Sequence, residues 1–178
     1  RIDSSGNVGI GTSSPSAILT TDPESGNFSS TYNNYDGVGL FIRGNGTSGN
    51  GNYGPALVFG SCDSDTVNQD HKHSAISVVQ TDTDPNQTGL AFWTHPSNTS
   101  TDALVEAMRI DASGNLLVGT TDDQPFNNSA GSTADNGLAL KDNGQLQVAA
   151  YKDTANTGSV VYFNRTSTDG DIIDFRTD

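Results

Sequence analysis

Apolar residues along this chain fall in short alternating runs, and clusters of Gly, Asn, Ser, Asp and Thr separate one run from the next. An alternation with period two is typical of half-buried β-strands. Ten strands are predicted in this way: 38–43, 56–60, 74–80, 89–94, 104–111, 115–119, 138–141, 145–150, 160–164 and 171–176. The segment 101–108 has some helical propensity, but it runs directly into Arg-Ile-Asp, so we expect a loop followed by a strand. The predicted fold class is all-β.

One twelve-residue motif occurs twice. Arg1–Thr12 and Arg109–Thr120 are identical at eight of twelve positions and begin 108 residues apart. Each copy has the pattern of a hairpin, in which Asp and Asn bond local backbone groups and Gly takes a positive φ. The predicted turn residues are Asp3, Gly6 and Asn7 in the first copy and Asp111, Gly114 and Asn115 in the second.

The repeat divides the chain into two β-modules. Residues 1–108 form the first, with Cys62–Asp102 as an extra excursion, and 109–178 form a second, incomplete one. A second, weaker sequence similarity, between Asp36–Phe41 and Asn136–Lys141, supports this division into modules. Because the chain begins and ends inside the pattern, we expect it to be part of something longer.

The composition favours a core shared between chains. Of 178 residues only 32% are hydrophobic, and 20 are glycine, which leaves little apolar surface for a private core. We therefore expect an extended, repeat-containing fibrous homotrimer whose short strands share a threefold core. The residues expected to point into this core include Ile2, Val8, Ile10, Val58, Ile110, Leu116 and Val118.

The charge and the single cysteine exclude several classes of protein. A net charge of −13 disfavours binding to nucleic acid or to anionic membranes, and no apolar run is long enough for a membrane span. With Cys62 alone, neither a disulfide framework nor a cysteine-based zinc site is available within one chain.

Few residues of the chain are candidates for metal binding, catalysis or ligand binding. In an extended segment, the side chains of His71 and His73 would point to the same side. The histidines of three copies could then hold a transition metal at a trimer axis. The alternative is that both are ordinary surface histidines. We otherwise expect no cofactor. We expect no enzymatic activity, because no nucleophile–base pair or phosphate-binding glycine loop is evident. Tyr32, Tyr35 and Tyr53 lie in polar stretches where their rings could stack on a receptor sugar, and Trp93 is expected to pack within or between sheets.

The repeated motif, with Ser14-Pro15 after the first copy and Met108 before the second, resembles a signature of bacteriophage tail fibre and tail-spike proteins. Val160–Arg165 and Gly170–Arg176 resemble the stretch that in this group precedes a C-terminal endosialidase-type chaperone. The resemblance implies a homotrimeric fibre segment in the virion, extracellular, that contributes to host attachment. Its implied partners are its own copies, other tail or baseplate proteins, and a host surface glycan or protein.

Two alternatives remain open from the sequence. The first is a carbohydrate-binding or glycan-hydrolysing module that uses carboxylates such as Glu106 and Asp111, which would have to lie roughly 5–10 Å apart in a cleft. The second is a bacterial trimeric surface adhesin with the same shared core.

Overall fold

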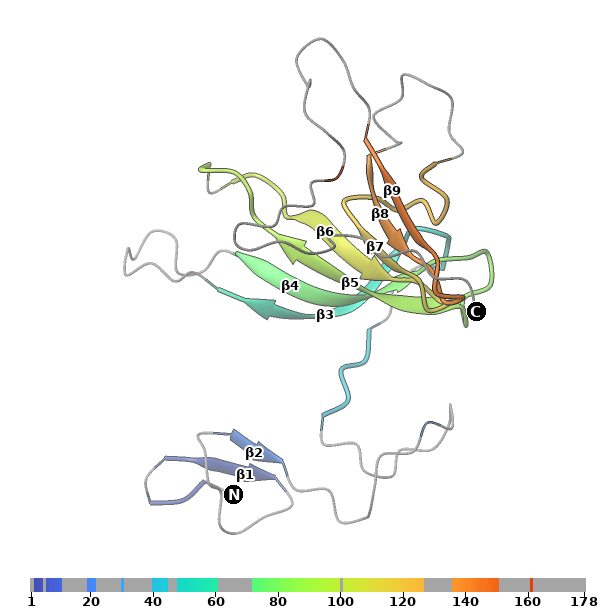
Figure 1. The fold of residues 1–178 in the computed structure, drawn as a ribbon. Coiled ribbons are helices and arrows are strands. Elements are labelled where there is room, and N and C mark those ends of the chain that lie inside the picture. Colours follow the sequence, from blue (N-terminus) through green and yellow to red (C-terminus); the bar gives the residue numbers. More distant parts are fainter. Residues whose placement is uncertain are drawn as a thin grey trace, which may run out of the picture. The chain divides into compact units, whose positions relative to one another are not determined.

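The structure is a computed structural model that describes residues 2–4, 6–10, 19–21, 30, 40–44, 48–60, 72–99, 101–126, 136–150 and 161. The chain divides into two compact units, Arg1–Gly44 and Asn45–Asp178. Every element within the described residues is a β-strand, so the predicted all-β class is confirmed (Figure 1).

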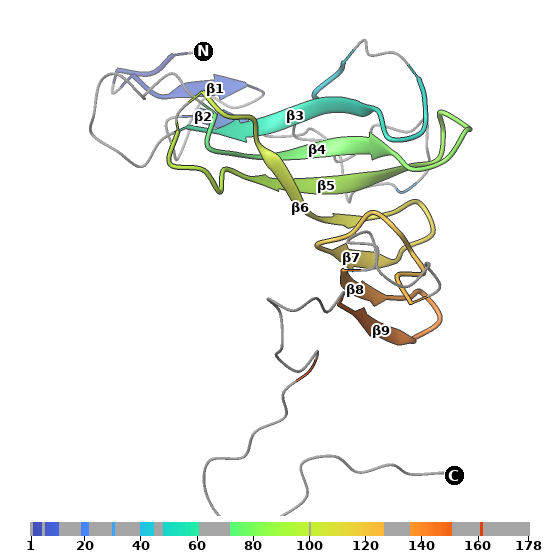
Figure 2. The same ribbon diagram turned by 90° about the horizontal axis from the view of Figure 1, so that it is seen from above.

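The larger unit contains one seven-stranded antiparallel sheet (Figures 1 and 2). Its strands follow one another across the sheet in chain order, so each strand pairs with the next one along the chain. The strands are β3 (Tyr53–Phe59), β4 (Ser74–Gln80), β5 (Thr88–Thr94), β6 (Val105–Ile110), β7 (Leu116–Val118), β8 (Gly137–Leu140) and β9 (Leu146–Ala149).

The smaller unit contains a two-stranded parallel sheet of β1 (Val8–Ile10) and β2 (Leu19–Thr21). An isolated antiparallel bridge joins Ile2 to Val8 and closes the first predicted hairpin. The parallel pairing with β2 was not predicted, because a parallel partner leaves no turn signal beside the strand.

The two copies of the motif form the same turn. In the first, the Asp3 amide donates to the Asn7 carbonyl at 2.9 Å and the Gly6 amide to the Asp3 carbonyl at 3.1 Å. The corresponding distances at Asp111 are 3.0 and 3.1 Å. The predicted hairpin turns are therefore confirmed in both copies.

Side chains complete each turn in the same way. The Asp3 carboxylate accepts from the backbone and side-chain amides of Asn7 at 2.9 and 3.1 Å, and Asp111 accepts from those of Asn115 at 2.9 and 2.7 Å. Gly6 and Gly114 have φ values of 86° and 88°, which a side chain would strain. The pairing is also shared, since Ile2 lies opposite Val8 as Ile110 lies opposite Leu116.

The seven strands predicted between residues 56 and 150 are confirmed, with ends that differ by a few residues. Two expectations are corrected. Leu40–Arg43 lies in no strand, although residues 38–43 were predicted as one, and Tyr53 begins β3 although a polar loop was expected there. The predicted strands 160–164 and 171–176 lie outside the described residues, apart from Val161.

The module boundary at residues 108 and 109 falls within β6, so the repeat divides the sequence at a point where the sheet is continuous. The division into modules 1–108 and 109–178, with Cys62–Asp102 as an excursion, stays a prediction. In the part of the chain that the structure describes, no helix is long and apolar enough to cross a membrane.

Candidate functional site

The seven-stranded sheet carries two faces of opposite character. Residues paired across antiparallel strands point to the same side, so the register assigns each residue to a face. One side, which we name the apolar face, consists of large apolar side chains from all seven strands: Leu57, Phe59, Ile76, Val78, Leu90, Phe92, Met108, Ile110, Leu116, Val118, Leu138, Leu140, Leu146 and Val148.

None of these large apolar side chains is buried in the single chain. Leu57, Phe59, Leu90, Ile110, Val118, Leu140, Leu146 and Val148 are exposed, and the remaining members are half-buried. Exposure reaches 63% at Leu146. A continuous apolar surface of this extent is typical of a surface that binds a partner.

Of the seven residues expected to point into a shared core, three lie on the apolar face. Ile110, Leu116 and Val118 belong to the apolar face. In the smaller unit, Ile2 and Ile10 are exposed in the single chain. Val58 is the exception, because it lies opposite Ala75 and therefore points to the other side of the sheet.

The other side, which we name the clamp face, buries mainly small and polar residues. Its buried members are Ala75, Ser77, Val79, Ala91, Arg109, Leu117 and Ala139. The buried Pro125 and an ion pair between the Lys141 ammonium and the Asp123 carboxylate anchor the 119–126 segment. Packing on this face therefore comes from within the chain.

A buried ion pair lies on the clamp face. The Arg109 guanidinium is bound by the Glu106 carboxylate through Nε–Oε1 at 2.5 Å and Nη2–Oε2 at 2.8 Å. Residues three apart in a regular strand point to opposite sides, but the pairing of β5 and β6 shifts between Phe92 and Trp93. This bulge brings Glu106 and Arg109 onto one face.

Tyr53 extends the network to the edge strand β3. Its hydroxyl donates to Glu106 Oε2 at 2.9 Å. Burial, together with the hydrogen bond to Glu106 and the charge of that residue, raises the pKa of the Tyr53 phenol. Burial alone would lower the pKa of Arg109, but its bonds to Glu106 and the negative charge there raise it. Both groups thus hold their protons firmly, as in a structural clamp.

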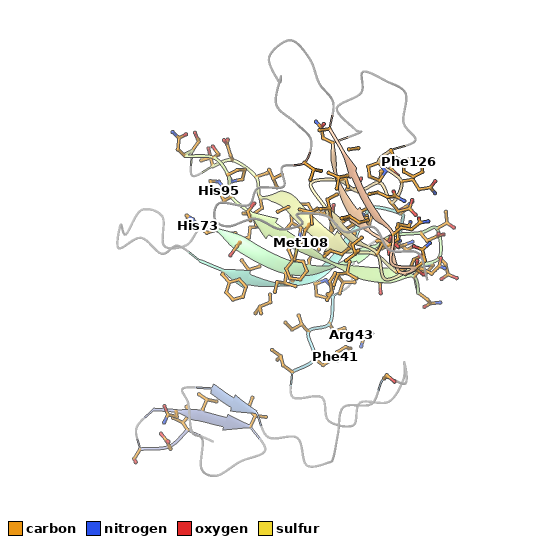
Figure 3. The ribbon with its side chains drawn as sticks, viewed as in Figure 1. Phe41, Arg43, His73, His95, Met108 and Phe126 are labelled. Carbon is orange, nitrogen blue, oxygen red and sulfur yellow. The ribbon has the colours of Figure 1, made fainter. Side chains whose placement is uncertain are left out.

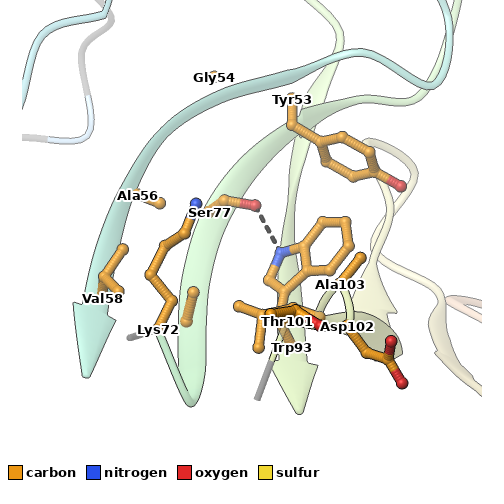
Figure 4. Close-up of a pocket in the computed structure, with 12 residues that line it drawn as sticks. Tyr53, Gly54, Ala56, Val58, Lys72, Ser77, Trp93, Thr101, Asp102 and Ala103 are labelled. Atoms are coloured by element: carbon orange, nitrogen blue, oxygen red, sulfur yellow. Dashed lines mark hydrogen bonds between the residues drawn. The ribbon is translucent and has the colours of Figure 1, made fainter. Parts of the chain in front are cut away.

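A pocket of about 690 Å³ opens on the clamp face beside this network (Figure 4). The rings of Tyr53 and Trp93 meet edge to face at 4.5 Å, and Trp93 Nε1 donates to Ser77 Oγ at 2.8 Å. Lys72 and Asp102 also line the pocket. Trp93 packs on the sheet, as the sequence indicated, and it presents an aromatic wall to the pocket.

A second, more polar pocket of about 670 Å³ lies beside the turn that follows β6. Its lining includes carboxylates of Asp82, Asp111, Asp122 and Asp123. Asp111 already accepts turn hydrogen bonds on both oxygens. Among the described residues, no group of three or more His, Cys, Asp or Glu side chains could hold a metal ion.

The predicted ligand-binding residues are only partly described. His71, Tyr32 and Tyr35 lie outside the described residues. His73 lies beside His95, with the two ring centroids 5.7 Å apart. The sequence analysis did not single out His95 or Arg109 as site residues. His95 meets His73 across two strands, and Arg109 meets Glu106 because of the bulge in the pairing of β5 with β6.

The two carboxylates of the glycan-hydrolase alternative have structural partners. Glu106 is bound by Arg109 and Tyr53, and Asp111 by the amides of its own turn.

Comparisons with known proteins give no identification: no protein-family model matches the chain, and no curated protein matches it.

Proposed function

We propose that this chain is a structural and adhesive segment of a homotrimeric bacteriophage tail fibre that contributes to attachment at the host surface. The observation that carries the trimeric part is the exposed apolar face of the seven-stranded sheet. The assignment to a phage comes from the resemblance of the repeated motif. In this proposal the apolar faces of three copies form the shared core, and the fibre is part of the virion.

The chemistry of the apolar face favours association with copies of the same chain. Its remaining strand positions hold uncharged residues such as Ser74, Thr88 and Thr94. Acidic chains could therefore meet there without burying a charge, while their carboxylates stay in water. Burying the exposed half of a Leu or Ile side chain contributes roughly 1 kcal/mol, and each copy supplies many such side chains.

The mass of the chain in solution tests the shared core. Light scattering should give three times the mass of one chain. Leu140→Asp, which puts a charge in the apolar face, should reduce the mass to that of a folded single chain. The matched control is Asn143→Asp in the exposed turn nearby, which adds the same charge and should leave the mass unchanged. A wild-type monomer would refute the proposal.

The adhesive role needs a second experiment. Antibodies raised against the chain should label the tail of virions that carry the sequence and should reduce adsorption to host cells. Labelling of a bacterial surface instead would favour the trimeric adhesin.

A second candidate function, glycan binding, is favoured by the pocket that Tyr53 and Trp93 help to line (Figure 4). Aromatic rings stack on the apolar sides of sugars, and Lys72 and Asp102 supply polar groups at the same pocket. Trp93 is the single tryptophan of the chain, so its fluorescence reports on this pocket alone. Titration with soluble host glycans should change that emission in the wild type and less in Lys72→Ala. An unchanged emission would argue against this site.

A further inference from the structure

His73 and His95 form a close pair of imidazoles at one end of the seven-stranded sheet (Figure 3). Ser74 lies opposite Thr94 in the pairing of β4 with β5, so His73 and His95 occupy the next opposed positions. The His73 amide also donates to the Phe59 carbonyl at 2.9 Å, which extends the ladder by one residue. The backbone thus fixes the pair, with ring centroids 5.7 Å apart and the rings inclined by 50°.

The Nε2 atoms of both rings are buried, and neither has a hydrogen-bond partner among the residues that the structure describes. A buried polar atom without a partner costs about 1–3 kcal/mol, so native proteins seldom leave one without a hydrogen-bond partner. The two imidazoles that carry these atoms lie side by side, with ring centroids 5.7 Å apart. Imidazole nitrogen is the commonest protein ligand of zinc and related transition metals, so an ion would satisfy both atoms at once.

We propose that His73 and His95 bind one divalent transition-metal ion, with Zn²⁺ as the expected occupant. With Zn–N bonds of about 2.0–2.1 Å, two rings that share a tetrahedral ion have centroids roughly 5–6 Å apart. The observed separation of 5.7 Å fits this range. Two imidazoles leave the other coordination positions open to water or to another ligand.

This site is distinct from the one that the sequence suggested. That site would use His71 with His73, two residues apart on one segment, and would need three chains to surround the ion. The pair of His73 with His95 joins two strands of the same chain. It would stabilise the end of β4 against β5, independently of how many copies assemble.

Zinc titration of the untagged full chain by calorimetry, followed by Co²⁺ titration with visible absorption, tests the proposal. We expect one ion per chain, a tetrahedral Co²⁺ spectrum, and a rise in the melting temperature with Zn²⁺. His73→Ala and His95→Ala should each weaken binding by at least about tenfold. His71→Ala, the matched control, should bind as the wild type does, and so should Cys62→Ser, which removes the single thiol.

His73→Phe and His95→Phe keep an aromatic ring but remove the nitrogen ligands. They replace the alanine variants in the binding measurements if the alanine variants do not fold. Loss of binding in these folded variants supports the site. Absence of Zn²⁺ binding to the wild-type chain would overturn it. Loss of binding in His71→Ala or Cys62→Ser, with His95→Ala unaffected, would also overturn it, because the ion would then lie elsewhere.

Discussion

On the clamp face of the seven-stranded sheet the buried side chains are mostly small or polar, whereas the large aliphatic side chains lie half exposed on the apolar face. In a typical domain the large apolar residues are the most buried ones. Under the proposed function, this sheet is stabilised from two sources. Connections within the chain cover the clamp face, and we propose that other copies of the chain cover the apolar face.

The two faces also differ in the type of interaction. The clamp face relies on directional contacts, such as the two bonds between Glu106 and Arg109 and the bond from Tyr53 to Glu106. The apolar face offers only non-directional contacts, which gain strength with the area removed from water. Substitutions on the clamp face should therefore act on the fold of each chain, and those on the apolar face mainly on assembly.

The largest effect is expected at the buried ion pair. Glu106→Ala leaves the Arg109 guanidinium, 6% exposed, without its carboxylate, and should lower the free energy of unfolding by about 3–5 kcal/mol. Urea unfolding measures the change. Glu106→Gln, which can still accept a hydrogen bond, should lose less. If both variants unfold like the wild type, the clamp is not a source of stability.

The next largest effect on stability compares the two faces of the sheet within one strand. In β7, Leu117 is 1% exposed on the clamp face, and its neighbour Leu116 lies on the apolar face. Leu117→Ala should cost roughly 2–5 kcal/mol at any protein concentration. Leu116→Ala should cost only about 1 kcal/mol in the dilute single chain and more in the assembled protein. Unfolding measured over a range of concentrations tests this, and equal, concentration-independent costs would contradict it.

A smaller effect is expected at the turn that fixes the register between β6 and β7. Asp111→Ala removes the acceptor of the Ser113 and Asn115 bonds and should cost about 1–2 kcal/mol. A slip by one residue would exchange the two faces. Hydrogen exchange at the amides of β7 should therefore become faster in this variant than in Ser113→Ala, which keeps the Asp111 carboxylate.

The smallest effect is expected at Tyr53. Tyr53→Phe removes the bond to Glu106 and should cost about 0.5–1.5 kcal/mol near neutral pH. Because the pKa of Tyr53 is raised in the folded chain, its contribution is complete below the ordinary tyrosine pKa of about 10 and is lost as the pH rises through the folded value. Stability measured from neutral to alkaline pH should therefore fall more in the wild type than in Tyr53→Phe.

Local sequence features were sufficient to predict β3 to β9 and both hairpins. The alternation of apolar residues predicts β4 as residues 74–80. The sequence pattern Asp-x-Ser-Gly-Asn predicts the hydrogen bonds of the turn. Period two and turn chemistry act over a few residues, so neither needs a distant partner. A third turn at Lys141–Gln145, with Gly144 at φ 85°, has the same backbone bonds and a similar Asp-Asn-Gly signal.

Contacts that depend on how the strands pair were decided only by the tertiary structure. The bulge in β6 placed Glu106 beside Arg109, the register of β4 with β5 placed His73 beside His95, and Val58 pointed to the side opposite to the one expected. Each outcome depends on how one strand is aligned with another, and a shift of one residue reverses the side to which a side chain points. The sequence by itself determined where β3 to β9 lie and where both copies of the motif turn. The pairing between strands decided which residues meet.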